Sequence, residues 1–557
     1  MRKLFSQRSL HSLLATGVIF AMLLAACAPA GAPAAAPAAA SAPQEAAPNA
    51  QAENSADTPA AGDKILLYGG NQDIDNIDPA TGENYSINAA LLSLYDAFFI
   101  VRGETVENNL VDSYEASADA SEFTFKLKQN AKFSDGSALN ADAVVYSWQR
   151  LIRLQGPPTY RWAGIADEKS ISKVDDYTVK FTLLKPFAPF VGTLTQFFIV
   201  NPTVVEANKG TDDGQTYLKS TAAGSGPFTQ GRWEIGNLYE FKANPDYWGG
   251  WKNESHIDGF LWIIKRDNAS QLNSLLAGET HIADTIGLNE AEKIRGTEGF
   301  NVAENAGIFV NTVKMNTQGK YMSDPNLRMA VAYAFNYEEL PKIEDVPVVL
   351  MKGPTPLNFP GAVKDLDVPS YNIEKAKEYL KKSQWPDGGI TLDYVYVTDL
   401  KREEVTGLLL LEGLQELNIT LNMKPMLWPD MVASCATPDV GPDMINIYTQ
   451  PAYLDPDAHL YNQYHSGQWG SYNSCSFYKN EAVDKLLDEA RVTADPATRL
   501  GMYEEANRLI AADQPAIWTY TESTLLGFNN CVGGYQFRPL ESLSVLFQDL
   551  TMDGCQG

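Results

Sequence analysis

Three stretches of the chain alternate apolar and polar residues with a period of two. They cover residues 123–128, 177–183 and 392–397. Successive side chains of a β-strand point to opposite faces, so this alternation indicates a strand with one buried and one exposed face. The sequence therefore predicts a half-buried strand at each of these three places.

Helical patterns lie between these stretches. Asn140 is a residue type that caps helix N-termini, and Asp142 follows in the first turn, where the helix dipole favours a negative charge. The apolar residues after the cap fall on one helical face: Val144, Val145, Trp148, Leu151 and Ile152. The sequence predicts a helix that begins after Asn140.

Further helices are predicted at three places. One begins at Asn372 and runs through Lys382, one has an apolar face over residues 406–417, and Asp495-Pro496 combines an N-cap with proline at the first helical position. Strands and helices together indicate a mixed α/β protein.

The first 27 residues have the pattern of a bacterial export signal. Basic residues near the start precede an apolar stretch over 13–24, and Leu24-Ala25-Ala26-Cys27 follows. The last four residues resemble the lipobox of bacterial lipoproteins, in which the cysteine is acylated and becomes the mature N-terminus. We expect residues 1–27 to be a lipoprotein signal peptide and Cys27 to be lipidated. The alternative is an ordinary signal peptide with an incidental cysteine.

Residues 28–62 are almost wholly Ala, Pro, Ser, Asn, Gln and Glu. Such a segment has too few bulky apolar side chains for a core, and its recurring prolines interrupt any helix. We predict a disordered tether that holds the folded body off a membrane.

Length and charge narrow the class of protein. The chain has 557 residues, while a single core rarely grows beyond roughly 250–300 residues, so two or three lobes are expected. The net charge of −26 repels nucleic acid, so no nucleic-acid partner is expected.

Four cysteines remain after Cys27, at positions 435, 475, 531 and 555. An even number in an oxidising compartment is compatible with two disulfides. Three pairings are possible from the sequence. Cys435 with Cys475 and Cys531 with Cys555 would close the shortest loops.

The sequence lacks the usual signs of catalysis. The five histidines form no His-Glu-x-x-His motif or close metal-ligand cluster, and Gly224-Ser225-Gly226-Pro227 does not satisfy the Gly-x-Ser-x-Gly pattern. Carboxylate pairs such as Asp455 and Asp457 are common in so acidic a chain. We therefore expect no catalytic residue, no metal and no cofactor, and a binding protein rather than an enzyme.

Several segments in order along the chain carry a resemblance to a known family. They are Phe123 to Arg153 with its Asp135-Gly136 turn, Gly224 to Phe228, Asn244 to Gly250, Asn273 to Glu279, Asp324 to Phe335 and Asn480 to Leu487. The chain resembles family 5 solute-binding proteins, which include the oligopeptide-, dipeptide- and nickel-binding components of ABC importers. Tyr247 and Trp248 are expected to build the scaffold rather than contact ligand.

The resemblance implies a periplasmic-binding-protein-like α/β fold of type II, with two lobes around a hinge and an extra third domain. Lobe I would comprise 63–102, 198–285 and 525–557, the extra domain 103–197, and lobe II 286–524. The resemblance also implies an extracytoplasmic receptor that closes over a solute and delivers it to the permease subunits of an ABC importer. We expect a monomer that is attached to the cell membrane through its lipid.

Matching segments of relatives indicate the ligand-binding residues. In lobe I they are Glu83, Asn84 and Tyr85, in a loop shortly after the first strand. In lobe II they are Trp428, Tyr448, Thr449, Gln450, Tyr453, Trp518 and Tyr520. For the lobe II aromatics, core packing is the competing interpretation.

One position departs from the family pattern. Peptide-binding relatives commonly have an aspartate that pairs with the α-ammonium of the peptide, and this chain has Ala452 at that place. Glu83 or Asp455 could compensate, because a buried ammonium needs a partner. A peptide is the first candidate ligand. An oligosaccharide or another non-peptide solute suits an aromatic-lined, less charged cleft equally, and a hydrolase on this scaffold is a remote third possibility.

Overall fold

The computed structural model describes residues 63–344, 346–540 and 545–555. The predicted signal peptide, Cys27 and the tether lie outside these residues. The division into lobe I, extra domain and lobe II stays our proposal, and these names refer below to the ranges given above.

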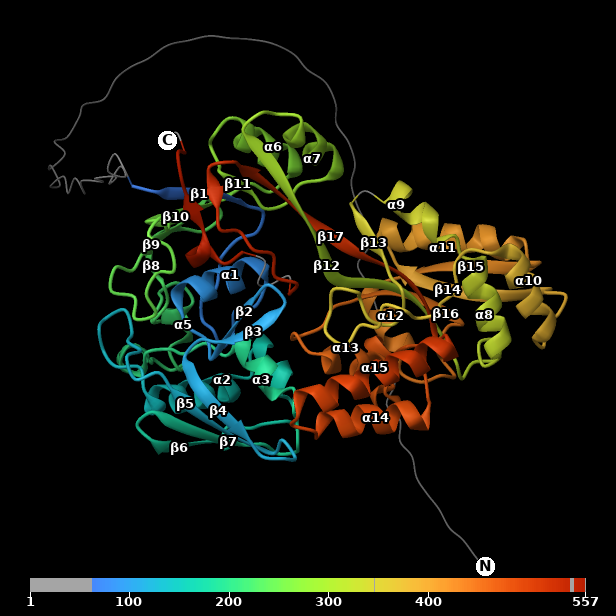
Figure 1. Cartoon of the computed structure of the whole chain (residues 1–557), viewed down its shortest axis with the longest axis horizontal. Coiled ribbons are helices and arrows are strands. Elements are labelled where there is room, and N and C mark those ends of the chain that lie inside the picture. Colours follow the sequence, from blue (N-terminus) through green and yellow to red (C-terminus); the bar gives the residue numbers. More distant parts are fainter. Residues whose placement is uncertain (1–62, 345, 541–544, 556–557) are drawn as a thin grey trace, which may run out of the picture. The chain divides into compact units, whose positions relative to one another are not determined.

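The described residues form helices and strands in mixed order (Figure 1). The helices are α1 (Tyr85–Leu94), α2 (Ala141–Leu154), α3 (Phe190–Thr193), α4 (Pro202–Ala207), α5 (Gln215–Leu218), α6 (Asn268–Leu276), α7 (Leu288–Arg295), α8 (Pro325–Ala334), α9 (Leu340–Ile343), α10 (Ile373–Lys382), α11 (Lys401–Gln415), α12 (Trp428–Ser434), α13 (Pro456–Tyr464), α14 (Glu481–Arg491) and α15 (Pro496–Asp513), with a 3-10 helix η1 (Pro157–Trp162). The strands are β1 (Ile65–Gly70), β2 (Phe99–Arg102), β3 (Thr105–Asn108), β4 (Val111–Ala116), β5 (Glu122–Leu127), β6 (Ile171–Asp175), β7 (Thr178–Thr182), β8 (Phe228–Glu234), β9 (Leu238–Ala243), β10 (Gly259–Ile264), β11 (Ile282–Ala283), β12 (Phe300–Met315), β13 (Val348–Leu350), β14 (Ile390–Val397), β15 (Ile419–Met426), β16 (Met444–Thr449), β17 (Ala516–Asn529), β18 (Val532–Gly533) and β19 (Thr551–Met552).

The predicted elements are confirmed. The three alternating stretches are β5, β7 and β14. The side chains of Asn140, Asn372 and Asp495 accept hydrogen bonds from backbone N–H groups in the first turns of α2, α10 and α15. The helix expected over 406–417 begins earlier, at Lys401, because its charged first turn lies outside the apolar face on which the prediction was based.

One long sheet runs through most of the described chain. Its strand order is β15-β14-β16-β12-β17-β11-β1-β10-β9-β8, and β13 also pairs with β17. The long strands β12 and β17 pair antiparallel in the middle of this order, and Figure 1 shows them side by side between the other strands. Their register shifts between Ala306 and Val310, where an irregularity interrupts the ladder.

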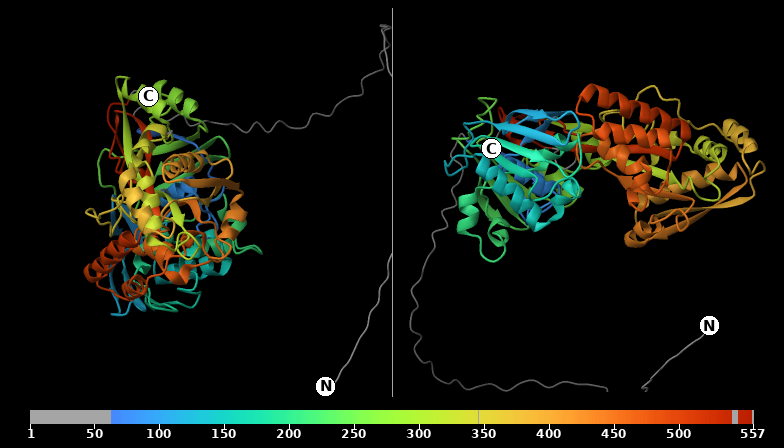
Figure 2. Two further views of the ribbon diagram at one scale, coloured as in Figure 1. Left: turned by 90° about the vertical axis from the view of Figure 1, so that its right-hand side faces the viewer. Right: turned by 90° about the horizontal axis from the view of Figure 1, so that it is seen from below.

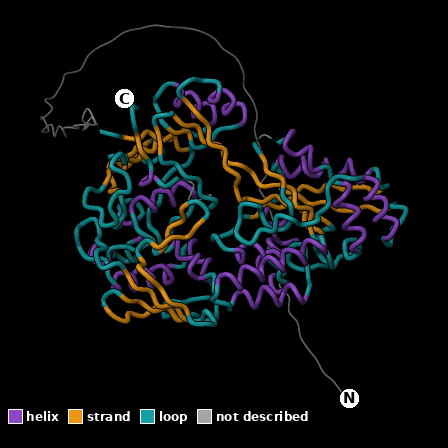
Figure 3. The backbone as a smooth tube through the Cα atoms, in the orientation of Figure 1, coloured by secondary structure: helices purple, strands orange, loops and turns teal. Residues whose placement is uncertain are grey.

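The extra domain has a sheet of its own, with strand order β4-β5-β7-β6, which is drawn in orange away from the long sheet in Figure 3. Helix α2 packs on β6 and β7. The Trp148 ring of α2 lies 4.9 Å from Phe181 and 5.3 Å from Trp162. This aromatic core fixes η1 against α2.

Helices cover the strands of lobe II. Helix α11 packs on β14, β15 and β16, while α8 and α10 pack against each other. Helices α14 and α15 also form a pair, visible in orange and red in Figure 2. Both favoured disulfides are present, Cys435–Cys475 and Cys531–Cys555, so the shortest-loop pairing is confirmed.

A buried ion pair links the loop before α1 to the extra domain. The two Nη atoms of Arg150 donate to the two Oδ atoms of Asp78, each over 2.7 Å. Asp78 is 0% exposed and Arg150 is 1% exposed. The backbone N–H of Ala80 also donates to Asp78 Oδ1, over 3.0 Å. Two charges taken out of water depend on each other in this way, because each alone carries a large desolvation penalty.

We predict that Arg150→Met destabilises the protein strongly. The substitution leaves the Asp78 carboxylate buried without its cation, which costs about 3–5 kcal/mol in such pairs. Urea unfolding measures the loss. Arg153→Met on the same helix is the matched control, since Arg153 is 39% exposed on its side chain and pairs with Glu168 and Asp213; it should cost less than about 1 kcal/mol. Equal losses in the two variants would contradict a special role for the buried pair.

Candidate functional site

A first cavity of about 210 Å³ lies where segments of all three proposed parts meet. Four segments contribute to this cavity: the loop after β1, the start of α1, the 3-10 helix η1 and the segment after β16. It is lined by Gln72, Glu83, Asn84, Tyr85, Asn88, Tyr160, Arg161, Ile308, Gln450, Pro451, Ala452 and Leu540. Half of these residues have amide or aromatic side chains, and the charged members of the lining are Glu83 and Arg161.

Local structure fixes the lobe I side of this cavity. Asn84 caps α1 by accepting a hydrogen bond from Ile87 N over 2.8 Å, which places Tyr85 at the first helical position. Gly82 allows the tight approach before the cap, because a Cβ atom there would lie 2.4 Å from the carbonyl oxygen of Asn76. The loop therefore presents Glu83, Asn84 and Tyr85 together.

Tyr85 is connected to a buried acid. Its hydroxyl lies 2.7 Å from the hydroxyl of Tyr68 on β1. Burial, followed by the nearby charge of Asp284, raises the pKa of the Tyr68 hydroxyl. Asp284 directly follows β11, which is parallel to β1, so the two strands end at the same edge of the sheet. Burial raises the pKa of Asp284 to about 7, although hydrogen bonds from Thr285 and Asn71 partly oppose the shift.

The two charges of the first cavity pair with each other. Arg161 Nη2 donates to Glu83 Oε1 over 2.6 Å, and Nη1 donates to the carbonyl oxygen of Pro158 over 3.2 Å. The third nitrogen, Nε, is buried and has no hydrogen-bond partner among the described residues. The Arg161 guanidinium also lies 4.6 Å from the centre of the Tyr160 ring.

A second cavity, of about 260 Å³, shares Tyr160, Arg161 and Ala452 with the first. It lies between the extra domain and lobe II. It is lined by Tyr160, Arg161, Ala163, Ile165, Lys185, Phe187, Ala452, Tyr453, Asn462, Gln468 and Arg491. Arg161 therefore lies at the junction of the two cavities.

The structure brings half of the expected ligand-binding residues to these cavities. Glu83, Asn84, Tyr85 and Gln450 line the first cavity, and Tyr453 lines the second. The buried Tyr453 hydroxyl donates to Asp457 over 2.8 Å.

The other expected residues lie elsewhere. Trp518 is buried, and its Nε1 donates to the Tyr464 hydroxyl over 2.9 Å. Tyr520 is also buried, and its hydroxyl lies 2.7 Å from that of Tyr448. Trp428 is 44% exposed, with its ring 5.2 Å from Tyr472.

Thr449 is buried in β16, and its hydroxyl has no hydrogen-bond partner among the described residues.

Sequence reasoning missed Arg161 and Tyr160, because no local pattern around η1 distinguishes them from other polar residues of the extra domain.

The two carboxylates that could replace the missing aspartate both have arginine partners. Asp455 caps α13 by accepting from Asp457 N over 2.9 Å and pairs with Arg499 over 2.5 Å. Glu83 is held by Arg161, as described above. Asp455 therefore has a structural role at the start of α13.

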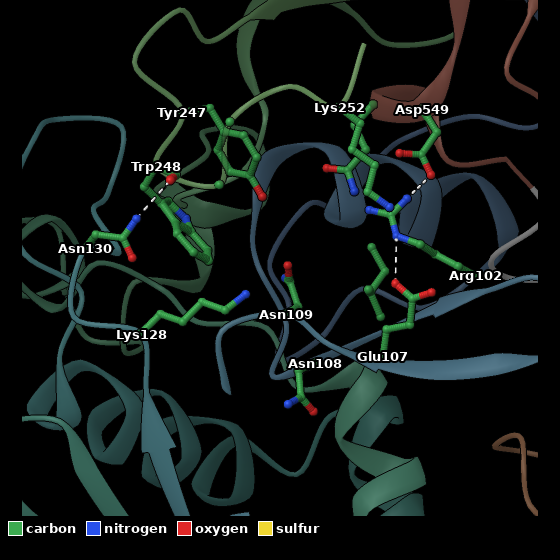
Figure 4. Close-up of a pocket in the computed structure, with 14 residues that line it drawn as sticks. Arg102, Glu107, Asn108, Asn109, Lys128, Asn130, Tyr247, Trp248, Lys252 and Asp549 are labelled. Atoms are coloured by element: carbon green, nitrogen blue, oxygen red, sulfur yellow. Dashed lines mark hydrogen bonds and ion pairs between the residues drawn. The ribbon is translucent and has the colours of Figure 1, made fainter. Parts of the chain in front are cut away.

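A third cavity, of about 250 Å³, lies beside Tyr247 and Trp248 (Figure 4). The Tyr247 hydroxyl and Trp248 Nε1 donate to the buried carboxylate of Asp96, over 2.9 and 2.7 Å. These bonds fix the turn that contains both residues to the segment just after α1. Figure 4 also shows Arg102 between Glu107 and Asp549, with which it forms ion pairs.

The described residues provide neither a metal site nor a membrane-spanning helix. No group of three or more His, Cys, Asp or Glu side chains there is placed to hold a metal ion. Within the same residues, no helix has the length and apolar character needed to cross a bilayer.

Comparison with known protein families identifies the family to which the chain belongs. The model described as bacterial extracellular solute-binding proteins, family 5 Middle, matches residues 105–471. The chain belongs to this family. Family 5 proteins are solute-binding components of ABC importers, and the predicted family is thus confirmed.

Individual family 5 proteins agree with this assignment. The chain is 29% identical to the "Probable D,D-dipeptide-binding periplasmic protein DdpA" of Escherichia coli K12, over 79% of this chain and 84% of that protein. It is 26% identical to "Di/tripeptide-binding protein 2" of Pseudomonas aeruginosa, over 84% of this chain and 91% of that protein. These relatives are named as binding proteins.

The fold has solved counterparts. The structure of HbpA2 from Haemophilus parasuis superposes with a TM-score of 0.80 at 22% identity, covering 88% of this chain and all of that one, 100%. The expected type II periplasmic-binding-protein-like fold of family 5 is confirmed.

We predict a pH-dependent contribution of Asp284 to stability. Its pKa is about 7 in the folded protein and about 3.9 in an unfolded chain. The folded state therefore holds a proton that the unfolded chain releases, so the contribution is complete below about pH 3.9 and is lost as the pH rises through about 7. Chemical unfolding of the protein and of Asp284→Asn should give a difference that changes by up to about 1.4 kcal/mol per pH unit in this window.

Asp267→Asn provides the contrast for this measurement. Asp267 is exposed at the start of α6, and the hydrogen bond from Ser270 N lowers the pKa of its carboxyl. The contribution of Asp267 to stability depends on pH in the opposite direction from that of Asp284, because it is lost as the pH falls. Parallel pH profiles for the protein and Asp284→Asn would contradict a buried, protonated Asp284.

Proposed function

We propose that the protein is a lipid-anchored, extracytoplasmic receptor that captures short peptides and delivers them to the permease of an ABC importer. The first cavity is its ligand site. Membership of family 5 supports the receptor role. The names of the two relatives, which refer to dipeptides and di/tripeptides, support a peptide ligand.

The lining of the first cavity is the observation that carries the peptide assignment. Four amide side chains line it: Gln72, Asn84, Asn88 and Gln450. A side-chain amide both donates and accepts hydrogen bonds, so it can pair with the N–H and C=O groups of a peptide backbone. The rings of Tyr85 and Tyr160 add apolar surface for side chains, as is common in ligand sites.

The same lining supports a second candidate. Amides also satisfy sugar hydroxyls, and aromatic rings cover the apolar faces of sugars. An oligosaccharide or another non-peptide solute is therefore the alternative ligand of the same receptor. The two candidates differ in the mass and composition of what the protein retains.

We predict that the protein carries short peptides when it is purified gently from an exporting host. Native mass spectrometry should show a set of bound masses in the peptide range, and tandem fragmentation should give peptide sequences. A single mass that fragments at hexose intervals would favour the sugar alternative. Absence of bound mass, together with no binding of a tripeptide library in solution, would contradict the peptide assignment.

Tyr85→Ala localises the binding. Removal of this ring should weaken binding of the retained peptides by about tenfold, or ~1.4 kcal/mol, as judged by calorimetry. Tyr371→Ala is the control, because Tyr371 is 45% exposed in a loop of lobe II and lines neither cavity. Equal effects of both substitutions would place the ligand outside the first cavity.

Cys27 is proposed as the attachment point of the lipid anchor. We predict that Cys27→Ser moves the protein from the membrane fraction to the soluble extracytoplasmic fraction and removes the lipid mass from its N-terminal peptide. The exported chain would otherwise remain membrane-bound through two or more acyl chains. Ser41→Ala in the tether is the control and should leave fractionation unchanged. Membrane retention of Cys27→Ser would contradict the anchor.

A further inference from the structure

The acids near the two cavities are each neutralised by an arginine. Glu83 pairs with Arg161 over 2.6 Å, and Asp455 pairs with Arg499 over 2.5 Å. Asp457 receives two hydrogen bonds from Arg491, over 2.7 and 2.9 Å. A ligand ammonium would have to compete with a guanidinium at each of these carboxylates.

The second cavity has a positive lining. Among its described lining residues, Arg161, Lys185 and Arg491 are basic and none is acidic. The charge of Arg491 is already matched by Asp457, which is fully buried. Lys185 is exposed at this lining, and no ion pair is found for it among the described residues. The surplus charge of the cavity is therefore that of Lys185, which lines the same cavity as Arg161.

Arg161 has an unused donor. Two of its nitrogens are engaged by Glu83 and Pro158, while the buried Nε–H has no acceptor among the described residues. A buried donor without an acceptor destabilises the structure, so an acceptor that reaches it stabilises the complex. A carboxylate is the group that best matches a guanidinium in charge and geometry.

Ala452 leaves room for such a group. Its methyl side chain lines both cavities, as do Tyr160 and Arg161. A ligand that lies along the amides of the first cavity can therefore extend past Ala452 toward Lys185. The end of the ligand that arrives there meets positive charge.

We propose that the protein recognises its ligand by a carboxylate held between Arg161 and Lys185, and that it accepts peptides whose amino terminus is blocked. This inference rests on the proposed peptide-receptor function. The substrate class is then short peptides with a free carboxylate and no required ammonium. Peptides acylated at the amino terminus belong to this class.

A tripeptide library in four chemical forms tests the inference. The forms are unmodified, N-acetylated, C-amidated and blocked at both ends, each titrated into the exported, ligand-stripped protein. N-acetylated peptides should bind within about threefold of the unmodified ones, and C-amidated peptides should bind at least about tenfold more weakly, which corresponds to ~1.4 kcal/mol.

Variants of Lys185 and Arg161 test whether these two residues cause the preference for peptides with a free carboxylate. Lys185→Gln should reduce the preference for the acid over the amide form, and Lys169→Gln, an exposed lysine of the same domain outside the cavities, should leave it unchanged. Arg161→Gln combined with Glu83→Gln removes the pair without leaving a lone charge. This double variant should abolish the preference while it still binds the peptide weakly.

The outcomes separate this inference from the proposed function. Failure of all four forms to bind would overturn the peptide receptor and the inference together. Binding of unmodified peptides with loss of the N-acetylated forms would overturn the inference alone, since an ammonium would then be required. Equal binding of acid and amide forms, or an unchanged preference in the double variant, would also overturn it.

Discussion

The buried pair of Asp78 and Arg150 is the constraint on which the arrangement of the site depends. Asp78 begins the loop that ends at the cap of α1, and Arg150 lies on a helix of the extra domain. The close contact of Gly156 supports the same junction, because a Cβ atom there would lie 2.1 Å from the carbonyl oxygen of Ala80. Since neither charge tolerates burial without the other, the two segments are held in one relative position. Glu83 lies further along the same loop and Arg161 lies on η1, just after α2, so this junction brings the elements of the two residues close together.

The distribution of charge explains how so acidic a protein can present a positive cavity. The chain carries a net charge of −26, yet the carboxylates around the cavities are matched one to one by arginines. Arginine suits this role because its planar guanidinium binds a carboxylate through two parallel hydrogen bonds. The excess negative charge of the protein therefore lies on other surfaces. A ligand in the cavity would meet the charges that line it.

The sequence allowed much of the fold to be predicted, for identifiable reasons. Asn140, Asn372 and Asp495 mark helix starts through local hydrogen bonds, and period-two alternation marks half-buried strands, so both signals lie within a few residues. The candidate site was predictable only where it is contiguous, as at Glu83 to Tyr85. Arg161 is separated from Glu83 by 78 positions, and only the folded chain shows that they meet. Trp518 and Tyr520 are expected at the ligand from the matching segments of relatives, with core packing as the alternative. Strand β17 lies inside the long sheet, and most of its side chains are buried.

The register shift in β12 links the site to the sheet that carries it. From Ala306 to Val310 the strand advances four positions while its partner advances two, from Ser523 to Thr521. The extra residues include Ile308, whose side chain lines the first cavity. A bulge disrupts the ladder locally and bends the strand that carries it. Any bending of the two strands at this point would move Ile308, so the shape of the cavity wall would change with the angle of the ribbon.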